Sequence, residues 1–64
     1  MPSTVIRTYW YNRRRHELDI IFQSSLRYTY QDVPETVYAG MQAASSKGEF
    51  FNEHIRGRFA FTRH

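Results

Sequence analysis

Two helix-start signals of the same design stand in the second half of the chain, and they constrain its fold more than any other feature. Asp32 lies three residues before Glu35, and Ser46 lies three residues before Glu49. In such a capping box the first side chain accepts a hydrogen bond from a backbone amide of the first turn, and the Glu side chain reaches back to a second amide. The spacing predicts two helices, the first starting near Asp32 and the second at Ser46.

The apolar residues that follow each signal recur at the spacing of a helix. Pro34 fits the first turn of the first helix, because no amide donor is needed there. The pair Ser45 and Ser46 is expected to end this helix, and Gly57 is a natural end for the second. The residues expected to face the core are Val33, Val37, Tyr38, Met41 and Ala44 in the first helix, and Phe50, Phe51 and Ile55 in the second.

The first half of the chain has the period of strands instead. Residues 5–11 are rich in β-branched and aromatic side chains, residues 17–22 alternate apolar and polar, and residues 26–31 alternate again. The intervening segments are short, so the three strands are expected to form an antiparallel meander. We predict an α+β fold of order β-β-β-α-α, with both helices packed on one face of the sheet. The tail 58–61 alternates too and is expected to dock as a short strand or extended segment, whereas Thr62 to His64 are expected to fray.

The chain has 64 residues and no cysteine, which excludes disulfides as a source of stability. Residues 1–64 are therefore expected to form one small domain that relies on packing of its five Tyr, five Phe and one Trp. No apolar run is long enough to span a membrane, and the first four residues lack the apolar region of a signal peptide. We expect a cytoplasmic protein without membrane association, and a monomer or weak dimer.

Several short motifs occur here in a recognisable order: Tyr28-Thr29-Tyr30, then Val33-Pro34 with Val37-Tyr38, then Ser46-x-Gly48-x-Phe50-Phe51-Asn52 and Ile55-Arg56. Together they resemble the KTSC domain, which is named from the C-terminal extension of some lysyl-tRNA synthetases. The resemblance covers about residues 3 to 61. It implies a compact domain whose function is not established, with RNA binding suggested by the synthetase context, an inference from association alone. Two departures stand out: Trp10 where a Gly is expected, and Ser24-Ser25 in place of a Gly-containing turn.

Catalytic chemistry finds little support in the sequence. His16, His54 and His64 are isolated from one another, and none has a partner at the spacing of a metal site. The serines fall at turn and cap positions, and the three glycines are too scattered to cradle phosphate. We therefore expect no enzyme activity, no metal and no cofactor.

The positive charge is carried almost entirely by arginine, with Lys47 as the only Lys among nine cations and a net charge of +3. Arginine suits phosphate contact and stacking on aromatic rings, although an Arg cluster in a loop is more often a solvated turn. If the helices cover one sheet face, Asp19, Ile21, Arg27 and Thr29 lie on the open face. Strand 5–11 adds either Arg7, Tyr9 and Tyr11 or Ile6, Thr8 and Trp10 to it. We favour the first set, because burying an unpaired Arg is costly, although a bulge would switch faces midway.

Two functions remain open from the sequence. The first is a non-catalytic module that binds RNA or single-stranded DNA weakly and with little sequence preference. The second is a protein-protein docking module that uses the same aromatic face, and for any single aromatic residue a place in the core is the more common role. The residues expected to contact nucleic acid are Arg7, Tyr9, Tyr11, Arg13, Arg14, Arg15, Arg27, Arg56 and Arg58.

Overall fold

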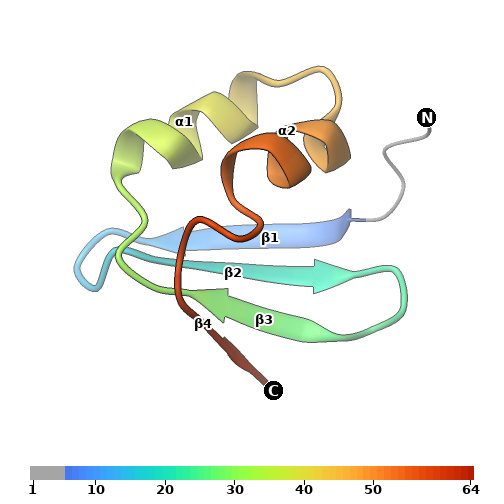
Figure 1. Cartoon of the computed structure of the whole chain (residues 1–64), viewed down its shortest axis with the longest axis horizontal. Coiled ribbons are helices and arrows are strands. Elements are labelled where there is room, and N and C mark those ends of the chain that lie inside the picture. The colour runs from blue at the N-terminus through green and yellow to red at the C-terminus, as the bar shows by residue number, and fades with distance from the viewer. Residues whose placement is uncertain (1–5) are drawn as a thin grey trace.

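A computed structural model describes residues 6–64 and shows a four-stranded antiparallel sheet with two helices over one of its faces (Figure 1). The predictions made for residues 1–5, including the start of the first strand, lie outside the described residues. The α+β class is confirmed, but the strand count of three is wrong. The elements are β1 (Ile6–Asn12), β2 (Glu17–Phe22), β3 (Arg27–Tyr30), α1 (Glu35–Ala43), α2 (Lys47–His54) and β4 (Phe61–Arg63), and the sheet order is β1-β2-β3-β4.

The C-terminal tail forms the additional strand. In β4, Phe61 pairs with Tyr30 and Thr62 with Thr29, and the amide of His64 donates to the carbonyl oxygen of Arg27 at 2.9 Å. The expectation that residues 62–64 fray is therefore wrong. The physical reason is that β3 offers a row of unpaired backbone donors and acceptors at its outer edge, and the tail satisfies them.

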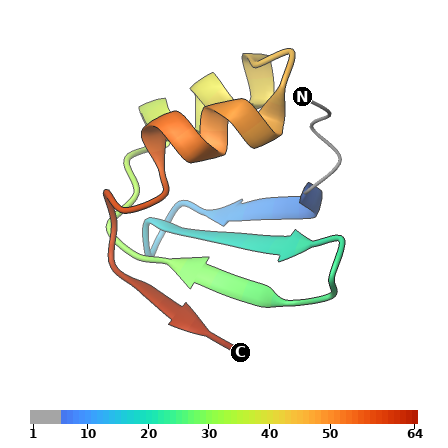
Figure 2. The same ribbon diagram turned by 45° about the vertical axis from the view of Figure 1, so that its right-hand side comes forward.

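The core lies between the sheet and the two helices, where the layers face one another in Figure 2. Rings from β2, β3 and α2 meet edge to face, with the Phe51 ring centroid 5.4 Å from Phe22 and 5.6 Å from Tyr30. Such pairs add to the free energy gained by burying the rings. The buried apolar residues are Leu18, Ile20, Tyr30, Val33, Met41, Phe51 and Ile55.

Only the second helix-start signal caps a helix as predicted. The Ser46 hydroxyl accepts from the amide of Glu49 at 3.3 Å. At α1 the N-cap is Pro34, with no side-chain hydrogen bond, so the cap assigned to Asp32 is wrong. Asp32 has φ +58° and turns the chain so that Val33 enters the core, which is a conformation that Asp tolerates better than most residues.

Strand β1 presents its tyrosines to the helices, which is the opposite of what we favoured from the sequence. The register shifts between Ile6 and Thr8, so Arg7 is the extra residue of a bulge and stays exposed. After the bulge, Tyr11 stacks on Tyr38 of α1 with ring centroids 4.8 Å apart, and its hydroxyl donates to the Val33 carbonyl oxygen at 2.5 Å. The bulge thus leaves Arg7 in solvent while the next odd-numbered residues pack inward.

Candidate binding groove and the opposite sheet face

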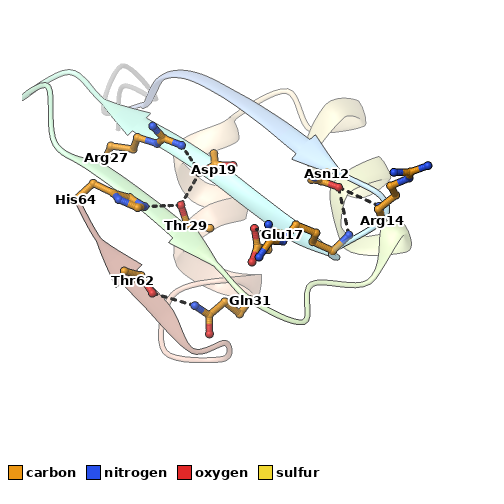
Figure 3. A network of polar contacts seen from close by, with 10 residues as sticks. Asn12, Arg14, Glu17, Asp19, Arg27, Thr29, Gln31, Thr62 and His64 are labelled. Atoms are coloured by element: carbon orange, nitrogen blue, oxygen red, sulfur yellow. Dashed lines mark hydrogen bonds and ion pairs between the residues drawn. The ribbon is translucent and has the colours of Figure 1, made fainter.

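The open face of the sheet carries a polar network, which Figure 3 shows from close by. Asp19 is only 6% exposed, and its Oδ1 accepts from the Thr29 hydroxyl at 2.5 Å and from Nη2 of Arg27 at 3.2 Å. The Thr29 hydroxyl oxygen is also 2.8 Å from Nε2 of His64. Because the Thr29 proton is directed to Asp19, its oxygen is free to accept from His64. The network ties β2, β3 and the end of the chain together.

Arg27 makes two contacts within this face. Besides its ion pair with Asp19, its guanidinium carbon lies 5.3 Å from the ring centroid of Trp10, which is 42% exposed. This is a cation–π contact. Trp10 therefore lies on the open face, where we had expected Tyr9 and Tyr11. The face therefore holds one exposed ring beside a neutralised arginine.

The other predicted arginines are dispersed. Arg13 Nε donates to Glu35 Oε2 at 2.9 Å in an exposed pair, and Arg15 Nε lies 3.6 Å from Oε1 of the half-buried Glu17. Arg58 Nε donates to the carbonyl oxygen of Glu53 at the end of α2 at 3.0 Å. Arg14 sits at the tip of the turn before β2, where Asn12 Oδ1 accepts its amide hydrogen bond. The nine residues expected to contact nucleic acid are not assembled on one face, and whether they bind nucleic acid stays a prediction.

A groove of about 590 Å³ runs between α2 and the part of the sheet formed by β3 and β4. This volume is typical of small-ligand sites in proteins. The sheet side is aromatic, and Phe61, which is 53% exposed, is its most accessible ring. The groove is lined by Phe22, Ser24, Leu26, Tyr28, Tyr30, Gly48, Glu49, Phe51, Asn52, Arg56, Gly57 and Phe61.

The rings in this groove form a continuous wall. The Phe61 ring centroid lies 5.2 Å from that of Tyr28 and 5.4 Å from that of Tyr30, and the two tyrosines stack at 6.2 Å. Burial raises the pKa of Tyr30 to about 12, with a further increase from Tyr28 and an opposing effect of the nearby Arg56 guanidinium. Tyr30 is thus a neutral hydroxyl at physiological pH and its ring is part of the core.

Arg56 supplies the positive charge of the groove. Among residues 6–64 no carboxylate lies within ion-pair distance of its guanidinium, in contrast to Arg13, Arg15 and Arg27. Its side chain lies beside the aromatic wall rather than on the open sheet face. Of the nine residues proposed from the sequence, Arg56 alone lines the groove.

Sequence reasoning missed most of the groove. Glu49 was interpreted as part of a helix cap, and Phe61 was placed in a tail expected to form a short strand or an extended segment. The order of the sequence motifs could have indicated the groove, because six of the residues that carry the KTSC resemblance line it. These six are Tyr28, Tyr30, Gly48, Phe51, Asn52 and Arg56.

The fold is that of a small α+β domain, and comparison with known proteins identifies its family. The KTSC domain model matches residues 2–59, and the chain belongs to this family. The crystal structure of a KTSC domain protein from Yersinia pestis superposes with a TM-score of 0.93 at 31% identity, covering 100% of this chain and 90% of that one.

Lysine–tRNA ligases also contain a similar segment. The ligase of Nostoc punctiforme is 38% identical over 59 residues, and that of Trichormus variabilis is 36% identical over the same length. In each case the match covers 92% of this chain and 10% of the ligase. The chain thus spans about a tenth of the length of these curated relatives.

Two kinds of feature are absent from the part of the chain that the structure describes. Within residues 6–64, no group of three His, Cys, Asp or Glu side chains is placed to hold a metal ion. Over the same residues, neither helix has the length and apolar character needed to cross a membrane.

Proposed function

We propose that this domain is a non-catalytic module that binds single-stranded nucleic acid, preferably RNA, weakly and through the groove beside α2. The observation that carries the proposal is the accessible Phe61 ring against the half-buried Tyr28 ring, with the unpaired Arg56 next to them. Single strands are bound in this way, by stacking of bases on rings and contact of phosphates with arginine.

The relatives give the proposal independent but indirect support. The lysine–tRNA ligases that carry a similar segment act, by their name, on a tRNA. A domain attached to such an enzyme has RNA close at hand, which is an argument by analogy with these relatives. RNA is accordingly the first ligand class to test.

The charge distribution limits the affinity. Arg13 and Arg15 face carboxylates, and the net charge is only +3. Exposed ion pairs are weak, so these arginines still attract a polyanion at long range, but they do not define a site. We therefore expect a dissociation constant in the non-specific range, about 10⁻⁴ to 10⁻⁶ M at physiological salt.

The proposal is tested by fluorescence anisotropy with a labelled RNA octamer of mixed sequence in low salt. Arg56→Gln is compared with Arg14→Gln, which removes the same charge from an exposed arginine outside the groove. We expect the Arg56 change to weaken binding several-fold more than the Arg14 change. Phe61→Ala is expected to weaken it by about fivefold or more, because stacking on one ring contributes about 1 to 3 kcal/mol.

Two outcomes would contradict the proposal. Equal losses for the Arg56 and Arg14 variants would show that binding follows net charge and not the groove. Absence of binding by the unmodified domain at low salt would remove nucleic acid as the ligand and favour the protein-docking alternative. A circular dichroism melt of each variant controls for unfolding.

A further inference from the structure

The groove carries unpaired charges of opposite sign at its two ends. Glu49 lies in the first turn of α2 and Arg56 just beyond its last turn, seven positions later. At 1.5 Å per helical residue the two positions are about 10 Å apart along the helix axis. Within residues 6–64 neither side chain forms an ion pair with another residue. An occupant therefore meets an anion receptor at one end and a hydrogen-bond acceptor at the other.

The space between these ends suits a flat molecule. Glu49 and Asn52 are three positions apart and share one side of α2, Arg56 follows just beyond the end of this helix, and all three line the groove. The opposite wall consists of the accessible Phe61 ring and the half-buried Tyr28 ring. An aromatic ring stacked on this wall would turn its edge toward the polar side chains of α2.

Each end restricts the occupant further. Arg56 presents several N–H donors, which match a phosphate group. Glu49, when ionised, presents two oxygens that only accept hydrogen bonds. An acidic peptide would satisfy Arg56 but would be repelled by Glu49, and a basic peptide would be repelled by Arg56. A nucleotide has the required order of groups: a phosphate, a sugar, and a planar base with N–H donors on its far edge.

The carboxylate distinguishes among the bases. The Watson–Crick edge of guanine carries two adjacent N–H donors, at N1 and at the 2-amino group, and a carboxylate can accept both. Adenine and cytosine place a single amino donor beside a ring acceptor, and uracil places carbonyl oxygens on both sides of its one donor. Each of these acceptors would face the carboxylate oxygens without a hydrogen bond, and the two acceptors would repel one another because both carry negative charge or partial negative charge.

We propose that the groove holds one guanine nucleotide of an RNA strand, with the base on Phe61 and Tyr28, its N1–H and 2-amino group donating to Glu49, and an adjacent phosphate on Arg56. Asn52 lies between the two ends and supplies an amide for the sugar or base edge. This inference rests on the proposed function, and it adds a preference to a binding mode that otherwise tolerates any sequence.

The test uses labelled uridine octamers that carry one central guanosine, inosine or adenosine. Inosine differs from guanosine only by lacking the 2-amino group, so it isolates one of the two donors. We expect the guanosine octamer to bind about tenfold more tightly than the inosine octamer. This factor corresponds to the loss of one hydrogen bond to a charged acceptor. Glu49→Gln should remove this difference between the guanosine and inosine octamers.

Glu53→Gln is the matched control, because it makes the same charge change on an exposed part of α2 that does not line the groove. Equal binding of the guanosine, inosine and adenosine octamers would overturn the guanine assignment and leave the proposed function standing. A guanosine preference that survives Glu49→Gln would overturn the role of Glu49. If no octamer binds at low salt, the proposed function itself fails, and this inference with it.

Discussion

Replacing Thr29 by Val is expected to destabilise the domain strongly, because one hydroxyl joins three elements of the sheet. Thr29 Oγ1 lies 2.5 Å from Asp19 Oδ1 and 2.8 Å from His64 Nε2. Val has nearly the same shape but no hydroxyl, so the nearly buried Asp19 carboxylate keeps only its contact with Arg27. A hydrogen bond to a charged group contributes about 1.5 to 3 kcal/mol, and the β propensity of Val offsets a small part of its loss.

We therefore expect Thr29→Val to lower the free energy of unfolding by about 2 kcal/mol. For a chain of this size the total is roughly 3 to 10 kcal/mol, so the loss is a large fraction. The corresponding decrease in Tm is about 8 to 16 °C. Urea unfolding followed by circular dichroism and by Trp10 fluorescence measures it, and Trp10 also reports on the network through its contact with Arg27.

Thr62→Val provides the control, since Thr62 pairs with Thr29 across the strands and accepts only an exposed hydrogen bond from Gln31. The Thr62→Val variant should lose less than about 0.5 kcal/mol of unfolding free energy, as most surface substitutions do. If the two valine variants lose the same stability, the contribution assigned to the Asp19 network is wrong.

Four further outcomes are expected. Ser46→Ala should cost about 1 kcal/mol in urea unfolding, the usual loss for an N-cap, because its hydroxyl caps α2. Tyr11→Phe should cost about 1 kcal/mol, since it removes the bond to the Val33 carbonyl oxygen, and a neutral result would contradict the placement of Tyr11 under α1. Ser25→Gly should raise the urea midpoint, because Ser25 has φ +71° and Gly adopts this conformation without strain. The Tyr30 hydroxyl has a pKa of about 10 in the unfolded chain and about 12 in the folded one. Between these values only the unfolded chain loses the proton, so the free energy of unfolding should decrease as the pH rises from 10 to 12. In Tyr30→Phe that part of the decrease should be absent when urea midpoints at pH 9 and pH 11 are compared.

Much of the secondary structure followed from the sequence because it depends on neighbours along the chain. The alternation in residues 17–22 and 26–31 and the helical spacing around Met41 each reflect a local period, and each element formed near the expected residues. Ser46 capped α2 because a cap needs only the next turn. The family resemblance was likewise carried by local motifs in a fixed order.

The face of β1 could not be decided in the same way. Both sets of alternating residues in residues 5–11 include aromatic rings, so the pattern has no clear apolar side. The bulge at Arg7 keeps this arginine in solvent, and the strand beyond it turns Tyr11 toward α1. A register shift costs little locally, and the packing available on the helix side decides where it falls.

The sequence by itself determined which segments become the first three strands and the two helices, the absence of disulfides, and the dominance of arginine among the cations. Tertiary structure decided which arginines remain unpaired and which rings share a surface. Glu35 and Glu17 meet Arg13 and Arg15, and the tail brings Phe61 to the edge of β3. Local periods specify the elements because their energies depend on near neighbours, whereas charge pairing and a groove depend on distances between residues far apart in the chain.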